Sequence, residues 1–260
     1  MTKISSYIEK VNQANRKALS IFLTAGFPTK ENFVELALSV LENGADMLEI
    51  GIPFSDPLAD GPTIQQSSQT ALENGVNMKD VFSFCEKIKS KTDKPLILMG
   101  YANPIIKYGT KNFCEDALNS GAVGLIVPDV PIDEYESFYT NDFNNFEKIL
   151  LTTPASSDER IKEIDKKGEG FVYCVSVTGT TGTRTNFDEH VLKNLERTYS
   201  LVTKNKMLIG FGISSPENIK TFLPFCDGVI VGSAVIKKIN EDYKTLPEFI
   251  GTLNNACELR

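Results

Sequence analysis

The chain has 260 residues, of which 41% are hydrophobic and 23% charged, so it is long enough for one barrel-sized domain or two small ones. Its net charge of −7 and pI near 5.0 disfavour nucleic acid and anionic membranes as partners. No apolar run approaches the length of a membrane span, and the first residues lack the apolar core of a signal peptide, which predicts a cytoplasmic protein.

Short apolar strands and amphipathic helices alternate along the chain. The sequence predicts a helix over residues 4–15, a strand over 19–25 and then a helix in which apolar residues recur at helical spacing: Phe33, Leu36, Ala37, Val40 and Leu41. Further strands are predicted over residues 47–50, 95–100, 124–128, 148–152, 171–176, 207–212 and 228–232. Further helices are predicted over residues 63–73, 78–91, 110–119, 132–143, 157–167, 188–203 and 215–223. A final helix is predicted to follow the strand over 228–232 and to end at about residue 256.

Eight strand–helix units with apolar strands predict a parallel sheet covered by helices. No linker or shift in composition divides the chain, so we expect an α/β fold with a single (β/α)8 TIM-barrel domain over residues 1–260. The pattern adds one helix before the first strand and one extra helix after the second. A doubly wound open sheet remains an alternative, because periodicity does not show closure.

Glu49 and Asp60 form a candidate acid–base pair. Glu49 lies in the short apolar strand 47–50, where an unpaired charge is unfavourable, so it is either a neutral acid or held by a partner. The loop from residue 53 to 62 contains three prolines and carries Asp60 beyond the carboxyl end of that strand. In a barrel this is the end at which active sites lie, so the pair is a candidate for proton transfer.

Three glycine-rich turns follow the last three strands, at residues 177–184, 210–215 and 231–235. Glycine lets backbone amides approach an anion closely, and Gly232 and Ser233 open the last helix, whose free N–H groups favour negative charge. We therefore expect a phosphate monoester as part of the ligand. The segment 180–185 is rich in hydroxyl groups, and we interpret it as a lid that closes over the substrate.

Other chemistries are disfavoured by what the sequence lacks. No lysine falls at the carboxyl end of a predicted strand, which disfavours a Schiff-base aldolase. His190 is the only histidine and is predicted to lie at the start of a surface helix, so a zinc site is not expected. The five cysteines are scattered, form no Cys-x-x-Cys pair and are predicted to be reduced. No Walker loop or dinucleotide fingerprint is present.

A long motif resembles the signature of the tryptophan synthase alpha subunit family: residues 48–65, LEIGIPFSDPLADGPTIQ. The resemblance extends through residues 23–28, 99–104, 128–131, 177–182, 210–213 and 231–234. It implies retro-aldol cleavage of indole-3-glycerol phosphate to indole and glyceraldehyde 3-phosphate. It also implies a beta-subunit partner in an alpha-beta-beta-alpha tetramer that receives the indole and carries pyridoxal phosphate, while the alpha chain itself needs no cofactor.

The resemblance also implies roles for individual residues. Glu49 resembles the family's general acid and base, and Asp60 the carboxylate that holds the indole N–H. The residues that match the indole pocket are Phe22, Met99, Tyr101, Ile126, Tyr173 and Phe211, with Thr181 in the lid. Those that match the phosphate site are Gly182, Gly212, Gly232 and Ser233. Pro128 departs from the pattern, because some members have alanine there.

Three other functions remain open from the sequence. An isomerase or epimerase of a phosphorylated sugar would also use two carboxylates and a phosphate site, but would not require an apolar pocket. A free-standing lyase would release indole without a partner. A protein that only activates a beta subunit would not depend on Glu49.

Overall fold

Eight parallel strands close into a barrel in the computed structural model, which describes residues 2–176 and 189–259. The strands pair in chain order, and β8 pairs with β1, so the predicted TIM barrel is confirmed and the open sheet is wrong. The strands are β1 (Ala18–Thr24), β2 (Met47–Gly51), β3 (Leu96–Met99), β4 (Gly124–Ile126), β5 (Glu147–Thr152), β6 (Phe171–Val175), β7 (Lys206–Gly210) and β8 (Gly228–Val231).

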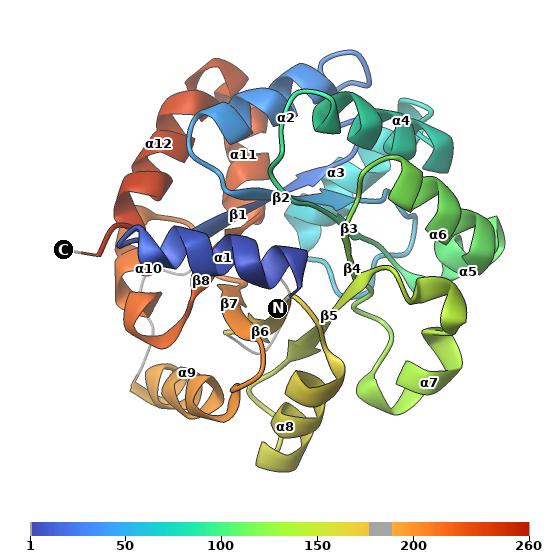
Figure 1. The fold of residues 1–260 in the computed structure, drawn as a ribbon. Coiled ribbons are helices and arrows are strands. Elements are labelled where there is room, and N and C mark those ends of the chain that lie inside the picture. Colours follow the sequence, from blue (N-terminus) through green and yellow to red (C-terminus); the bar gives the residue numbers. More distant parts are fainter. Residues whose placement is uncertain (1, 177–188, 260) are drawn as a thin grey trace.

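Helices surround the barrel and cover the outer faces of its strands (Figure 1). The predicted additions are both present: α1 precedes the first strand, and both α3 and α4 follow β2. The helices are α1 (Lys3–Gln13), α2 (Phe33–Glu42), α3 (Pro62–Glu73), α4 (Met78–Lys89), α5 (Ala102–Tyr108), α6 (Thr110–Asn119), α7 (Tyr135–Phe138), α8 (Asp158–Lys167), α9 (Glu189–Leu201), α10 (Pro216–Phe222), α11 (Ser233–Asp242) and α12 (Leu246–Ala256). None of these described helices is long and apolar enough to cross a membrane.

The helix α1 crosses the amino-terminal end of the barrel (Figure 1). The fully buried side chain of Ile4 reaches the inner face of β4, where an added Cβ at Gly124 would stand 2.7 Å from its Cδ1 atom. The carboxylate of Glu147 accepts the amide proton of Ile4 at 3.1 Å, which satisfies an otherwise free donor of the helix. This end of the barrel is therefore filled, and a ligand must enter from the other.

The predicted helix over residues 132–143 is wrong, because the segment divides into three short pieces. A 3₁₀ turn (Ile132–Glu134), α7 and a second 3₁₀ turn (Asn141–Phe143) replace it. The chain leaves the helical region at Tyr139, whose ψ is 72°. The rings of Tyr139 and Phe143 then meet edge to face with centroids 5.5 Å apart, so an aromatic cluster overrides the helical spacing.

The predicted final helix is also divided, into α11 and α12. Asp242 adopts an extended conformation and its side chain accepts the amide proton of Lys244, which begins the turn Tyr243–Thr245. Pro247 lies at the start of α12, where its missing N–H is tolerated. The helix α5 has no counterpart among the predicted elements. Pro104 lies in its first turn, where a proline does not remove a hydrogen bond of the helix.

Candidate active site

Glu49 lies on the inner face of β2 and is fully buried. Its Oε1 atom accepts a hydrogen bond of 2.8 Å from the Ser20 hydroxyl on the adjacent strand β1. Its Oε2 atom is buried without a hydrogen-bond partner in the described part of the chain. Burial raises the pKa of Glu49 to about 8, and the bond from Ser20 opposes that rise. The side chain is therefore a neutral acid at neutral pH, one of the two states that the sequence allows.

Asp60 projects from the loop between β2 and α3 and is 8% exposed. The loop turns at this point because the amide of Asp60 donates to the carbonyl of Pro57 at 3.0 Å, and Pro62 begins α3 immediately afterwards. Tyr101 donates its hydroxyl to Asp60 Oδ2 at 2.9 Å. Burial raises the pKa of Asp60 to about 6 and the Tyr101 hydrogen bond opposes this, so the carboxylate form dominates at neutral pH.

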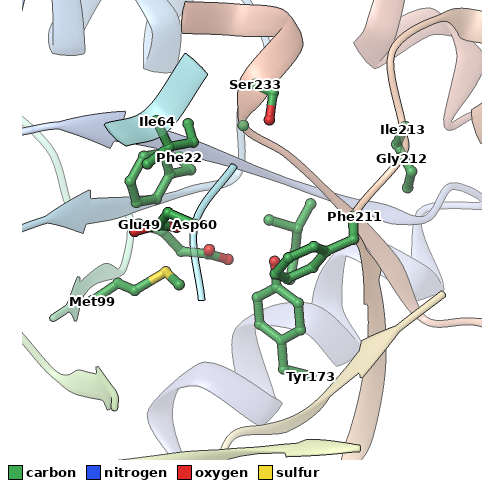
Figure 2. Close-up of a pocket in the computed structure, with 12 residues that line it drawn as sticks. Phe22, Glu49, Asp60, Ile64, Met99, Tyr173, Phe211, Gly212, Ile213 and Ser233 are labelled. Carbon is green, nitrogen blue, oxygen red and sulfur yellow. The ribbon is translucent and has the colours of Figure 1, made fainter. Parts of the chain in front are cut away.

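Both carboxyl groups line one cavity at the carboxyl end of the strands, with a volume of about 500 Å³ including its open mouth. In Figure 2, Glu49 and Asp60 lie between Phe22 and Met99 on one side and the rings of Tyr173 and Phe211 on the other. The Tyr173 and Phe211 rings meet edge to face, with centroids 5.9 Å apart. A flat apolar group fits between such walls, with an acid and a carboxylate at its edge.

Glycines opposite the aromatic side chains make room for them. An added Cβ at Gly51 would stand 2.5 Å from Cζ of Phe22, and one at Gly210 would stand 2.3 Å from the hydroxyl oxygen of Tyr173. No real Cβ can approach so closely. Two glycines at strand ends therefore allow two rings to lie against the backbone and leave the centre of the cavity open.

One end of the cavity is lined by Gly212, Gly232 and Ser233. Gly232 precedes the first turn of α11, in which the amides of Val235 and Ile236 donate to the Gly232 carbonyl. The amides of Ser233 and Ala234 come before the first of these bonds, at the helix end whose dipole favours an anion. On the neighbouring loop, Phe211 and Gly212 both have positive φ, at 68° and 78°. The Ser176 hydroxyl donates to the carbonyl of Phe211 and holds that turn. Among the described residues that line this end of the cavity, none has a cationic side chain, so they offer backbone donors.

Comparison with known proteins identifies the family. Residues 8–258 match the family model described as tryptophan synthase alpha chain. The tryptophan synthase alpha chain of Petrotoga mobilis is 46% identical over 93% of this chain and 92% of its own, and that of Christiangramia forsetii is 43% identical over 88% and 91%. The chain belongs to the tryptophan synthase alpha chain family. It is therefore a lyase that cleaves indole-3-glycerol phosphate in tryptophan synthesis.

Solved structures agree with this assignment. A Mycobacterium tuberculosis tryptophan synthase structure matches with a TM-score of 0.92 and 30% identity, covering 100% of this chain and 99% of the other. The tryptophan synthase alpha subunit of Legionella pneumophila str. Paris matches with a TM-score of 0.86 and 33% identity, covering 99% and 98%. The similarity thus covers the whole barrel.

Four other residues were expected at the site, and none of them is among the described residues that line the main cavity. Tyr101 stands behind Asp60 and lines a smaller adjoining cavity. Ile126 is fully buried on β4, beside Met99, and is not among the residues that line the main cavity. Thr181 and Gly182 lie outside the described residues.

Three apolar lining residues were not predicted: Ile64, Ile213 and Ile230. Ile64 and Ile213 each fall within a motif that resembles the family, so their motif positions could have identified them. Ile230 is an ordinary strand residue whose contact with the cavity depends on barrel closure.

Two lysines at strand ends, the five cysteines and the histidine are the other residues that the sequence singles out. Among residues 2–176 and 189–259, no group of three or more His, Cys, Asp or Glu side chains could hold a metal ion. Lys148 and Lys206 lie at the amino-terminal ends of their strands, opposite the cavity. All five cysteines are buried and unpaired. His190 is exposed near the start of α9.

Proposed function

We propose that Glu49 and Asp60 carry out the retro-aldol cleavage of indole-3-glycerol phosphate in this chain. The observation that supports the proposal is that an acid and a carboxylate with different pKa values line one apolar cavity. Because their pKa values differ, one carboxyl group can transfer a proton while the other, as a carboxylate, stabilises a positive charge.

Glu49 begins as the acid and protonates C3 of the indole ring. Asp60, as the carboxylate, accepts the indole N–H and stabilises the positive charge that this protonation creates. The bond between C3 and the glycerol side chain then breaks and its electron pair returns to the ring. The hydroxyl next to that bond loses its proton to Glu49 and becomes the aldehyde oxygen, so the acid is regenerated.

The binding roles follow from the same arrangement. We propose that Phe22, Met99, Tyr173 and Phe211 enclose the indole ring and that Gly212, Gly232 and Ser233 hold the phosphate through backbone donors. We assign Thr181 and Gly182 to the lid and phosphate site by their motif positions alone. Tyr101 acts on the indole through Asp60, and Ile126 supports the pocket floor from β4.

The proposal is tested by following indole release from the substrate, with and without a beta subunit, in Glu49→Gln and Asp60→Asn. We expect both variants to lose roughly a hundredfold or more in kcat, because each removes a group that acts in the transition state. Glu147→Gln is the matched control, since it changes a buried carboxylate at the filled end of the barrel. Wild-type rates in Glu49→Gln would refute the assignment.

A beta subunit is the partner expected for this family. Two exposed apolar side chains indicate the surface at which it would bind. Leu58 is 85% exposed on the loop that carries Asp60, and Ile106 is 57% exposed on α5. The amide of Ala59 donates to the Tyr101 hydroxyl at 3.0 Å, which links this loop to the start of α5. We propose that both side chains contact the beta subunit in an alpha-beta-beta-alpha tetramer, in which pyridoxal phosphate belongs to the beta subunit.

Stimulation by the partner separates this assembly from a free-standing lyase. Leu58→Ser and Ile106→Ser should weaken the stimulation and leave the activity of the isolated chain unchanged.

We further propose that residues 1–260 form a single domain, because the described parts of the chain make one closed barrel. The buried, unpaired cysteines suit a reducing compartment, which supports a cytoplasmic location.

A further inference from the structure

Ser20 is a polar residue within the barrel interior, on the inner face of β1. It pairs with Met47 on one side and Ile230 on the other, and it is fully buried. A buried hydroxyl group is unfavourable unless it is hydrogen-bonded. Its bond to Glu49 Oε1, at 2.8 Å, satisfies it. The placement of this serine is therefore tied to the carboxyl group of Glu49.

The bond distinguishes the two oxygens of Glu49. Because the Ser20 hydroxyl donates to Oε1, that oxygen acts as an acceptor. The single proton of the neutral acid then belongs on Oε2, which is buried and has no partner within the described residues. Since Glu49 lines the cavity, Oε2 is the oxygen left for a bound substrate.

We propose that Ser20 is a positioning residue for the reaction: its hydroxyl holds the Glu49 carboxyl group in one orientation, with Oε2 as the oxygen that exchanges protons with the substrate. The inference rests on the proposed acid–base role of Glu49. During turnover Oε2 gives its proton to indole C3 and later takes one from the substrate hydroxyl. Ser20 keeps its own proton throughout, and its bond strengthens while Glu49 is a carboxylate.

Loss of the hydroxyl group should change how Glu49 titrates. Among the described residues, the titratable groups that face Glu49 are Asp60, from the loop after β2, and Tyr173, from β6. Both remain in a Ser20→Ala variant. That variant removes the bond that lowers the pKa of Glu49 and leaves burial unopposed, so the pKa rises further. The acid form then persists to higher pH, while the carboxylate intermediate becomes less stable.

The test compares Ser20→Ala and Ser20→Cys with wild type, using the full chain saturated with a tryptophan synthase beta subunit. We expect Ser20→Ala to lower kcat roughly tenfold, with KM changed less than about twofold, because a hydrogen bond to a charged group is lost. In the pH profile of kcat, the alkaline limb should move to higher pH by about one unit, and the acid limb should stay in place. Ser20→Cys should lie between, since a thiol is a weaker donor.

Ser120→Ala is the matched control, because it removes a buried hydroxyl that donates to the Ala117 carbonyl at 2.7 Å, on the outer helix α6. An unchanged kcat and alkaline limb in Ser20→Ala would overturn the inference. So would an equal loss in Ser120→Ala, or a rise in KM alone, since either indicates a packing effect. Thermal melting checks each variant, and Ser20→Cys decides the matter if Ser20→Ala does not fold.

Glu49→Gln, measured beside these variants, separates this inference from the function on which it rests. An inactive Glu49→Gln with a wild-type-like Ser20→Ala would overturn only the role of Ser20. A fully active Glu49→Gln would overturn both. In the double variant Ser20→Ala/Glu49→Gln we expect no further loss beyond Glu49→Gln, because the serine acts through the carboxyl group.

Discussion

Tyr101 and Asp60 are joined by a hydrogen bond of 2.9 Å, in which the tyrosine hydroxyl donates to Oδ2. The same hydroxyl oxygen accepts the amide proton of Ala59 at 3.0 Å. The start of α5 thus holds both the backbone and the side chain of the loop after β2. A movement of that loop would therefore move the carboxylate of Asp60 with it.

Tyr101→Phe should lower kcat/KM roughly tenfold near neutral pH, because it removes a donor to a charged group. The Tyr101 bond lowers the pKa of Asp60, so its loss raises that pKa and shrinks the carboxylate population. The acid limb of kcat/KM should therefore move to higher pH. Tyr108→Phe is the control, since Tyr108 also donates to an aspartate, Asp116, but on the exposed surface. Equal effects in both variants would contradict the prediction.

The pH dependence of kcat/KM should be bell-shaped. Asp60 must be a carboxylate, so activity falls as the pH drops through about 6. Glu49 must start as the acid, so activity falls as the pH rises through about 8. Initial rates at low substrate concentration, measured across about four pH units, would show both limbs. A profile that stays flat through both values would mean that these groups do not control the reaction.

The sequence predicts the barrel well because its strands are apolar and regularly spaced. It fails where side-chain packing breaks a helix that the apolar spacing predicts, as at Tyr139, whose ring packs against Phe138 and Phe143. At the end of the chain a local signal existed: Asp242 and Pro247 mark the end of one helix and the start of the next.

The sequence likewise predicts some residues of the candidate site and misses others. The strand around Glu49 and the loop around Asp60 identify both carboxyl groups, because buried charge is rare and stands out in a sequence. The partner hydroxyl of Ser20 and the lining side chain of Ile230 could not be predicted. Both depend on which residues of neighbouring strands share the inner face, and that register exists only in the closed barrel.

Glu49→Gln should stabilise the fold at alkaline pH. The folded state holds a proton on Glu49 up to a pH of about 8, whereas the unfolded chain releases it above the ordinary glutamate pKa of 4.5. Wild-type stability therefore falls as the pH rises between these values, and glutamine does not titrate. The gain should be on the order of 2–4 kcal/mol at about pH 8 and near zero at about pH 4. Denaturant unfolding at both pH values measures it.

Glu147→Gln provides the contrast, because this buried carboxylate accepts the amide of Ile4 through both oxygens. Burial also raises the pKa of Glu147, but its hydrogen bonds to the start of α1 oppose that rise, and glutamine keeps only one of the two acceptor oxygens. Glu147→Gln should therefore stabilise the chain less at alkaline pH than Glu49→Gln does. A gain for Glu49→Gln that does not vary with pH would contradict the assigned protonation state.

Gly210→Ala should disturb both the fold and the site. The new Cβ would stand 2.3 Å from the hydroxyl oxygen of Tyr173, so the ring must move into the cavity or the strand must shift. Overpacking of this kind costs roughly 1–3 kcal/mol. Gly251→Ala is the control, since no atom lies within 4 Å of its added Cβ and it lies within α12. There alanine should stabilise by roughly 0.5–1 kcal/mol and leave activity unchanged.

Ser233→Asp should weaken binding of the phosphorylated substrate without weakening the fold. Position 233 is the first of α11, where a carboxylate interacts favourably with the helix dipole and stabilises the helix by roughly 0.3–1 kcal/mol. The same negative charge would repel a phosphate bound at that helix end. We expect KM for indole-3-glycerol phosphate to rise at least about tenfold, whereas inhibition by indole analogues that lack the phosphate stays the same. If both ligands weaken equally, the phosphate binds elsewhere and the variant has altered the pocket as a whole.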